Sequence, residues 1–510
     1  MTASILWRRA LLRAALVPLV VLAPIVALAP TADHRFNIYW HGGLFRDDPG
    51  RIVPQTFASL DGYLRAGNFR PFGRILEKAL DLFAYALGGL TGLPINVTLR
   101  LVSFGAAVLL GLAALLLAES VVTRGPLFRG PPSTLAAVVP FAVGAGLVAG
   151  GRSSPVVLFG GLYLTSAALV LVVVAAICRI GPDARLRIWW MPPLLAGGVA
   201  LAVFNELAYL ALPLATVAVA ARGRWVHPQP WRALARGAPA RALALLWLGF
   251  LPVFGVVRLY IANLCAGGGC YHASDVAAGP GVLPTFPVRL VAWFPPLMWQ
   301  AATRGGGRLS GVVLLLAAVV LAALAFVALR DLGRLTPVGR RPAVALAVVA
   351  GALLVLGATM GSLSIDVQQL VAAHRWGQGW RDSALTMPAG GLLLAAAVPL
   401  LGPRRLLAAA MVVVLAAGAA GSATANKRFR DTVAGSAAAR LDNRLAESMA
   451  DFDPTPAGAA RRCALRAEFF AMFADTPFSL RRFDQAFDAA ARQRAGVAFC
   501  PGVTAARTGR

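Results

Sequence analysis

Long apolar runs separated by short arginine-rich breaks are the feature that most constrains the fold of this chain. Of its 510 residues, 58% are hydrophobic and only 14% are charged. A soluble globular domain carries more charge, about 25% of its residues, and a membrane β-barrel needs strands that alternate polar and apolar residues over about ten positions. The sequence fits neither, so we predict an all-α, polytopic membrane protein.

Eleven apolar runs have lengths close to the ~20 residues that a straight membrane-spanning helix needs. The first, within residues 1–30, follows Arg8, Arg9 and Arg13 and has the layout of a signal peptide, but its length and the Pro30 after it favour a retained span with a cytoplasmic N-terminus. The other ten spans are expected at 97–118, 133–150, 156–178, 188–204, 206–221, 241–262, 309–329, 343–361, 385–402 and 405–421.

The distribution of positive charge predicts the orientation of these spans. The chain has 48 Lys+Arg against 22 Asp+Glu, a formal net charge of +26, and almost all of the excess is arginine. With the N-terminus inside, every cytoplasmic break is basic, as the positive-inside rule requires. The stretch 188–221 has room for one tilted span or two short ones, and two keep this agreement. We therefore assign the charge to topology in a multi-pass plasma-membrane protein, and not to nucleic-acid binding.

Four of the five cysteines fall on the predicted outer side. Cys265 and Cys270 follow span seven, and Cys463 and Cys500 lie in the tail after span eleven. Disulfides form in oxidising compartments. Neither pair has the ligand spacing or the neighbouring histidines of a zinc site. We therefore predict two disulfides, whereas Cys178 at the inner end of a span is expected to be a small apolar residue.

The composition changes at about residue 421. Residues 1–421 form the predicted membrane domain, and residues 422–510 an extracytoplasmic helical domain, because apolar residues such as Phe469 and Phe473 recur there at helical spacing. A domain this small buries little apolar surface, so a Cys463–Cys500 disulfide would add to its stability. Its role is either to bind an acceptor or a partner, or only to pack on the membrane domain.

The first outer loop, residues 31–96, concentrates polar residues. It holds six of the thirteen acids that precede the tail, together with six arginines and Lys78, against the positive-inside trend. Arginine presents a planar fork of donors suited to phosphate, so this loop predicts a phosphate-bearing ligand handled beside a carboxylate. The alternative is a set of surface ion pairs worth about 0–1 kcal/mol each. Helices expected within 57–90 would lie along the membrane surface.

Two further outer positions carry candidate residues. Glu206, beside Asn205, is the acid predicted nearest the membrane interior, where a charge is costly and commonly functional. The alternative is that residues 188–221 form a helical hairpin with Glu206 at its outer tip, where water would solvate it. The break after span nine contains groups that could bind phosphate and stack on a sugar. The alternative is that they form an aromatic belt at the membrane interface with arginines that snorkel to water. That break contains Asp366, His374, Arg375, Trp376, Trp380, Arg381 and Asp382.

A sequence pattern in the first outer loop resembles a known family. Phe45-Arg46-Asp47-Asp48-Pro49-Gly50-Arg51, followed by Asn68-Phe69-Arg70-Pro71-Phe72-Gly73-Arg74, is similar to the first outer loop of the GT-C superfamily, multi-span glycosyltransferases that use polyprenyl-phosphate-linked sugars. The form Asp-Asp-x-Gly-Arg … Gly-Arg resembles bacterial glucosyltransferase-type members that decorate surface glycans. The motif covers about 30 residues, and the layout of spans and loops extends the likeness over most of the membrane domain.

The resemblance implies an inverting transfer. A carboxylate takes the proton of the acceptor hydroxyl while cations stabilise the charge that develops on the departing lipid phosphate. It implies Asp47 or Asp48 as the base, with the other orienting the substrate or holding a divalent metal ion such as Mg²⁺ or Mn²⁺; Asp33, close to the end of span one, competes for the role. The candidate substrate- and phosphate-binding residues are Arg51, Arg70, Arg74, Glu206, His374, Arg375 and Arg381.

The predicted function is therefore a glycosyltransferase that moves a sugar from a polyprenyl-phosphate donor to a cell-envelope glycan or lipid acceptor on the outer face, with membrane lipids as its surroundings. One alternative is a secondary transporter or flippase for an anionic or lipid-linked substrate, although such proteins commonly place charges at mid-membrane, whereas this chain gathers them on one face. The other is a non-catalytic envelope assembly subunit that uses its tail as a dock.

Overall fold

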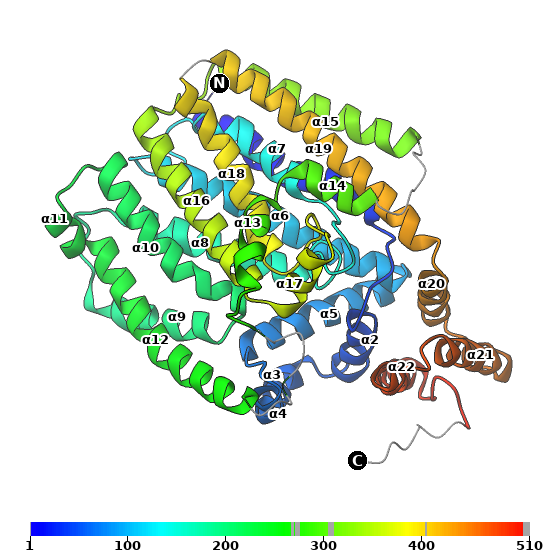
Figure 1. Ribbon diagram of the computed structural model, residues 1–510. Helices are drawn as coiled ribbons and strands as arrows, with labels where there is room; N and C mark the ends of the chain where they lie inside the picture. Colours follow the sequence, from blue (N-terminus) through cyan, green and yellow to red (C-terminus); the bar gives the residue numbers. More distant parts are fainter. Residues whose placement is uncertain (1, 267–269, 271–275, 304–310, 403–404, 503–510) are drawn as a thin grey trace.

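The computed structural model describes residues 2–266, 270, 276–303, 311–402 and 405–502 (Figure 1). Over these residues the only β-type pairings are two isolated bridges, Ser133 with Thr336 and Val276 with Ser364. All other regular structure is helical, which confirms the predicted fold class.

Eight helices among the described residues are long and apolar enough to cross a membrane, as expected of a polytopic membrane protein. Each coincides with a span predicted from the sequence. They are α6 (Ile95–Val122), α8 (Gly160–Arg179), the stretch Glu206–Val226 that includes α10 (Ala211–Ala221), α12 (Ala238–Cys265), α15 (Gly311–Leu332), α16 (Arg340–Ser362), α18 (Ser383–Leu401) and α19 (Arg405–Ala434).

The three other expected spans are helices of a different kind. α1 (Ala3–Leu22) has the length of a span but contains three arginines. α7 (Leu135–Gly146) and α9 (Met191–Ala202) have 12 residues each, fewer than the ~20 that cross a bilayer without help. The count of eleven spans therefore stays a prediction.

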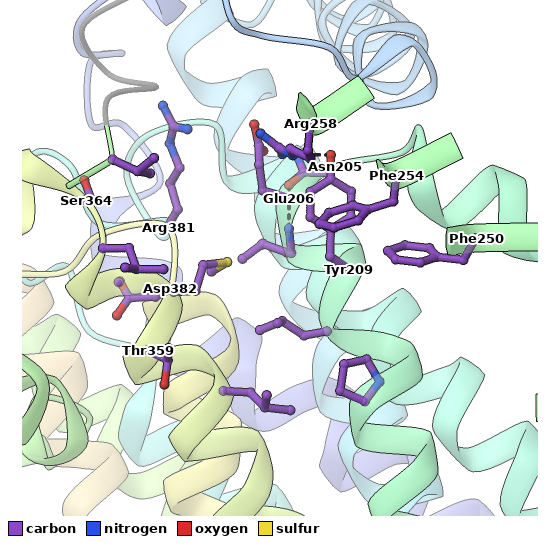
Figure 2. Close-up of a pocket in the computed structure, with 18 of the residues that line it drawn as sticks. Asn205, Glu206, Tyr209, Phe250, Phe254, Arg258, Thr359, Ser364, Arg381 and Asp382 are labelled. Carbon is purple, nitrogen blue, oxygen red and sulfur yellow. Dashed lines mark hydrogen bonds between the residues drawn. The ribbon is translucent and has the colours of Figure 1, made fainter. Parts of the chain in front are cut away.

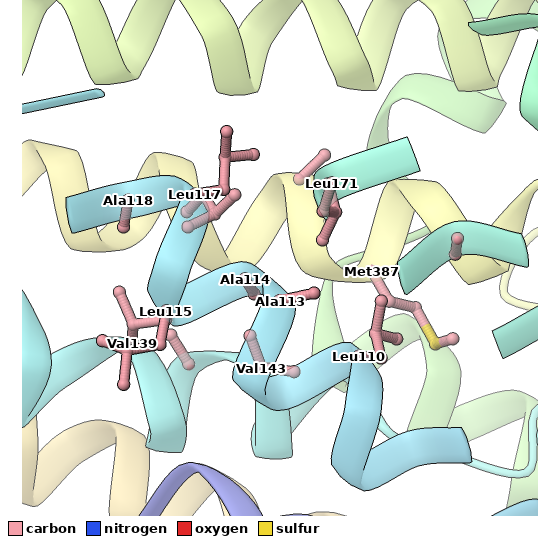
Figure 3. Close-up of a cluster of buried hydrophobic side chains, with 14 of the residues drawn as sticks. Leu110, Ala113, Ala114, Leu115, Leu117, Ala118, Val139, Val143, Leu171 and Met387 are labelled. Carbon is pink, nitrogen blue, oxygen red and sulfur yellow. The ribbon is translucent and has the colours of Figure 1, made fainter. Parts of the chain in front are cut away.

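α6 lies at the centre of the bundle and packs against α1, α5, α7 and α8. Its contact face is built from small and aliphatic side chains such as Ala114 and Leu117, which belong to the same buried cluster as Val139 of α7 and Leu171 of α8 (Figure 3). Lipid tails are as apolar as these side chains, so close van der Waals packing, and not hydrophobicity, holds such helices together. A Cβ atom added to Gly111 would lie 2.5 Å from the carbonyl oxygen of Ala14, which shows how closely the α1 and α6 backbones approach.

Two buried polar side chains satisfy the irregular backbone next to α1 and α7. Asn426 of α19 accepts a hydrogen bond from the N–H of Ala149 (2.7 Å) and donates to the carbonyl oxygens of Leu147 (2.9 Å) and Val21 (3.0 Å). Arg100 of α6 donates to three further carbonyl oxygens within 3.1 Å. Non-helical backbone is tolerated at membrane depth only where it is paired inside the protein, so these contacts explain how α7 ends within the bundle.

An ion pair joins α1 to α15 in the interior. Arg13 Nη1 lies 2.7 Å from Asp331 Oδ2, and the two side chains are 1% and 0% exposed. Arg9 Nη1 approaches the other carboxylate oxygen of Asp331 at 2.9 Å. The sequence predicted Arg9 and Arg13 only as topology signals, because nothing local to α1 indicates a partner 318 positions away.

The loop between α1 and α6 is helical, as expected for its later part. It contains α2 (His34–Phe45), α3 (Ile52–Ala58), α4 (Leu60–Arg65) and α5 (Pro71–Thr91). The break after α12 contains α13 (Val282–Val291) and α14 (Pro295–Thr303), and α17 (Ile365–Ala372) follows α16.

The tail consists of three helices that follow α19 without a break at residue 421. They are α20 (Ala437–Ala450), α21 (Pro456–Met472) and α22 (Pro477–Ala495). α22 packs against α2, so the tail covers part of the first loop (Figure 1). Both predicted cysteine pairs are at disulfide distance, with Cα–Cα separations of 5.3 Å for Cys265–Cys270 and 4.9 Å for Cys463–Cys500, and Cys178 is buried and free.

Candidate functional site

A cavity of about 470 Å³ lies between α10, α12, α16 and the loop 373–382. One end is polar and the other is apolar (Figure 2). The polar end is lined by Asn205, Glu206, Arg258, Ser364, Arg381 and Asp382. The apolar part is lined by Leu210, Pro213, Trp247, Phe250, Leu251, Phe254, Leu356 and Met360.

Glu206 is placed by the short helix Glu206–Leu210, which precedes α10. Asn205 caps this helix, because its side-chain oxygen accepts a hydrogen bond from the N–H of Leu207 at 3.0 Å. Glu206 Oε2 lies 3.4 Å from Arg70 Nη1, and 27% of the Glu206 side chain remains exposed. The buried amide nitrogen of Asn205 has no hydrogen-bond partner among the described residues, and such an unpaired donor beside a cavity is a position for a ligand.

Three arginines converge on Glu206 from separate parts of the chain. Arg70 comes from the first loop and is buried, with its Nε unpaired among the described residues. Arg258 projects from α12, where its Nη2 donates to the Tyr209 hydroxyl at 2.9 Å. Arg381 lies in the loop after α17, its guanidinium 5.6 Å from the centre of the Trp380 ring. Glu206 lies among these three cations, and the second carboxylate at this end, Asp382, is paired with Arg289. The polar end therefore has an excess of positive charge that attracts an anion.

A buried arginine on α13 holds the loop that carries Arg381. Arg289 is 1% exposed. Its Nε and Nη2 lie 2.9 and 2.8 Å from the two carboxylate oxygens of Asp382, and its Nη1 donates to the carbonyl oxygen of Gln378 at 2.9 Å. Such a bidentate pair fixes geometry as well as charge. Trp380 and Arg381 are therefore presented to the cavity from a braced loop.

A second polar cluster lies between α2 and α5. The carboxylate of Asp81 is shared by His34 Nε2 at 3.2 Å and His41 Nδ1 at 2.7 Å. Glu77 accepts hydrogen bonds from Asn37 at 3.0 Å and from Arg74 at 2.9 Å. The two carboxylates lie one helical turn apart on the buried face of α5.

The two α5 carboxylates are held in the charged form. Burial by itself raises the pKa of Glu77, but the charges of Arg74 and Arg70 outweigh it and hold the pKa below its usual range. Burial likewise raises the pKa of Asp81, and the hydrogen bonds from His34 and His41 reverse this and lower it. Because Arg70 interacts with both Glu77 and Glu206, the cluster is continuous with the polar end of the cavity.

The structure does not bring the predicted acidic pair to this cavity. Asp47 and Asp48 are exposed and do not line it. Asp47 instead accepts a hydrogen bond from Gln493 of α22 at 3.0 Å, and Gln493 lines a second cavity of about 240 Å³ between α5 and the tail. Arg51 is also exposed.

The other predicted site residues divide into three groups. Glu206 and Arg381 line the cavity, and Arg70 contacts it through Glu206. His374 and Arg375 are exposed in the same loop without lining it. The remaining two lie in the first loop: Arg74 belongs to the Glu77 cluster, and Asp33 is half-buried at the start of α2, where burial raises its pKa.

Arg258 is the site residue that the sequence interpretation missed. It lies within the predicted span 241–262, as an arginine in an otherwise apolar run. A charged residue inside a membrane helix is costly and marks a functional position, so the signal was present. Arg289 and the two histidines around Asp81 carried no comparable signal, because their partners lie on other helices.

A divalent metal ion held between Asp47 and Asp48 stays a prediction. Among the described residues, no group of three or more His, Cys, Asp or Glu side chains is placed to hold an ion. We derive no step through a metal ion.

Comparison of the chain with protein-family models, with curated proteins and with solved structures gave no match. What indicates a function in this chain is the polarity of the cavity, its position in the bundle and the groups that line it.

Proposed function

We propose that the protein is a membrane-embedded inverting glycosyltransferase whose donor, a sugar carried on a polyprenyl phosphate, binds in the cavity around Glu206. The observation that carries the proposal is the joining of a cationic end to an apolar wall in one cavity. A soluble sugar nucleotide would leave the apolar wall unused, whereas a lipid phosphate matches both parts.

The apolar wall reaches the surface of the bundle along α12. Leu251 lines the cavity and is 54% exposed, and its neighbours Leu248, Val256 and Leu259 on α12 are 63%, 70% and 70% exposed. Exposed aliphatic side chains along a membrane helix face lipid. A long isoprenoid chain can therefore enter sideways from the bilayer while its phosphate stays near Arg258 and Arg381.

The chemistry follows from the charges at the polar end. The acceptor oxygen attacks the anomeric carbon, its proton passes to a carboxylate, and the bond from that carbon to the lipid phosphate breaks with its electron pair leaving on the phosphate. Arg258 and Arg381 stabilise that growing negative charge. Two acids line the cavity, Glu206 and Asp382, and both carboxylate oxygens of Asp382 are bound by Arg289. We therefore propose that Glu206 accepts the proton. In this proposal Glu206 takes the role of base that the sequence resemblance implied for Asp47 or Asp48.

The side of the membrane is part of the proposal. Gly67 lines the cavity, and a Cβ atom added to it would lie 3.1 and 3.2 Å from the sulfur atoms of Cys265 and Cys270. Disulfides persist in oxidising compartments, so a disulfide at the cavity rim supports an outer-face site. We propose the orientation expected from the sequence for the rest of the chain, with eleven spans, a cytoplasmic N-terminus and an extracytoplasmic tail.

Transfer by the purified protein tests the proposal. Labelled sugar on a polyprenyl phosphate, supplied with envelope glycan or lipid acceptors, should become bound to the acceptor. Arg258→Met, Arg381→Met and Glu206→Gln should each lower the rate about 10²–10³-fold, as removal of one charge-stabilising group commonly does. Arg65→Met, on the exposed helix α4, is the matched control, and Asp47→Asn should retain activity.

Three outcomes would contradict this assignment. Full activity of Glu206→Gln would remove Glu206 as the base. Passage of the substrate across sealed vesicles without covalent change would identify a transporter or flippase. Loss of function on deletion of the tail, with no effect of any cavity variant, would identify an assembly subunit.

A further inference from the structure

A small basic cavity lies at the end of α10 opposite to Glu206. It has a volume of about 80 Å³ and is bounded by the C-terminal ends of α6 and α8, by the π-helical turn Arg222–Val226 and by α11 (Trp231–Arg236). Arg124, Arg179, Arg222 and His227 line it, and among the described residues no acidic side chain does.

The arginines of this cavity are held in place by backbone carbonyl groups. Arg222 Nη1 donates to the carbonyl oxygens of Ser120 and Val121, the latter at 2.7 Å. Arg179 Nη2 donates to the carbonyl oxygen of Gly125 at 2.5 Å. These bonds cap the end of α6, whose dipole carries only about half a negative charge. The cationic charge of the cavity is therefore only partly neutralised.

Arg124 offers the donors that remain. Its Nε donates to the carbonyl oxygen of Val226 at 2.8 Å, and its Nη1 and Nη2 have no hydrogen-bond partner within the described part of the chain. The pKa of His227 reflects this surplus of positive charge. Burial lowers the pKa most, the charges of Arg222, Arg124 and Arg179 lower it further, and Asp183 raises it.

Exposed tryptophans place this cavity at the level of lipid headgroups. Trp231 of α11 is 66% exposed, and Leu234 of the same helix lines the cavity. Trp189 and Trp190, at the same end of the neighbouring helix α9, are 70% and 57% exposed. Tryptophan gathers at the membrane–water interface because its ring is amphipathic. Lipid headgroup phosphates lie at this depth.

We propose that the basic cavity binds the phosphate group of an anionic membrane lipid. Its volume of about 80 Å³ is far smaller than the 470 Å³ of the cavity around Glu206, which suits a phosphate group better than a sugar. Basic pockets between membrane helices bind anionic headgroups in this way. The site is independent of the proposed transferase cavity, because it lies at the other end of the bundle and contains other residues.

Lipid binding to the full-length protein in detergent tests the proposal. After delipidation, phosphatidylglycerol should bind and raise the melting temperature, whereas phosphatidylcholine and inorganic phosphate at equal concentration should not. Arg124→Gln should weaken phosphatidylglycerol binding about tenfold, the effect of about 1.4 kcal/mol. Arg185→Gln, an exposed arginine at the same end that does not line the cavity, is the matched control.

A second variant covers the case in which Arg124→Gln fails to fold. Gly181 lines the cavity, and a Cβ atom added there meets no atom within 4 Å. Gly181→Asp therefore adds a negative charge at the rim while every arginine stays, and it should also weaken binding. Equal weakening by Arg185→Gln, or equal stabilisation by phosphatidylcholine, would overturn the site. Equal stabilisation by inorganic phosphate would overturn the lipid as its ligand.

Discussion

Asp442 provides a quantitative test of the way the tail packs on the first loop. Its carboxylate lies on α20, 8% exposed, 3.6 Å from Arg35 of α2. Burial raises the pKa of Asp442 from 3.8 to about 6, and Arg35 and Arg152 offset only part of this effect. The native state therefore holds its proton more tightly than the unfolded state does.

The sign and the size of the effect follow from that difference. A raised native pKa stabilises the fold below pH 3.8, and this stability is lost as the pH rises through about 6. About two pKa units at 1.36 kcal/mol each correspond to about 3 kcal/mol. Asp442→Asn, which keeps the shape and stays neutral, should therefore stabilise the packing of α20 by up to about 3 kcal/mol at pH 7.5, and by much less at pH 4.

Amide hydrogen exchange of α20 measures this stability in the full-length protein. Wild type and Asp442→Asn are compared at the same pH, so that the intrinsic exchange rates cancel. Slower exchange in the variant at pH 7.5, with a smaller difference at pH 4, is the expected result. Asp451→Asn, at an exposed position after α20, should have no such effect. Equal exchange at pH 7.5, or the same difference at both pH values, would refute the argument.

Three further perturbations test other contacts. Asp331→Asn leaves Arg13 buried without a counter-charge, so thermal unfolding should show a loss of about 3–5 kcal/mol. Replacing Cys463 and Cys500 by Ala opens a loop with a sequence separation of 37. The loss of the loop-closure constraint should lower the free energy of unfolding of the tail by about 4 kcal/mol, and chemical denaturation measures this change. Arg289→Met should free the loop 373–382, so that protease cleaves it faster.

The controls for these three experiments are chosen from the same elements. Arg8→Met on α1, an exposed neighbour of the ion pair, should leave the melting temperature unchanged. Replacement of Cys265 and Cys270, with a sequence separation of 5, should cost only about 2 kcal/mol by the same entropy argument. Arg375→Met, exposed in the loop itself, should leave its cleavage rate unchanged. Equal effects of control and test variants would refute the respective assignment.

Local properties of the chain were sufficient for much of the architecture. Apolar length predicted the helices that the structure contains, since a helix satisfies its own backbone and needs only a sufficient run of apolar residues. Cys265–Cys270 and Cys463–Cys500 could be paired because each pair is close in sequence or confined to one small domain. Helices in the first loop followed from periodic apolar residues.

The candidate site depended on tertiary packing. Arg70 and Glu206 are 136 positions apart, and only the packing of the start of α5 against residues 203–204 brings them together. The motif around Asp47 suggested the base by likeness, yet the turn after α2 directs it toward α22 and away from the cavity. Sequence alone determined which residues are charged and which segments are apolar enough to span a membrane, because charge and apolar length are properties of each segment. Which carboxylate meets the arginines was decided by helix packing, because that contact depends on how distant segments cross.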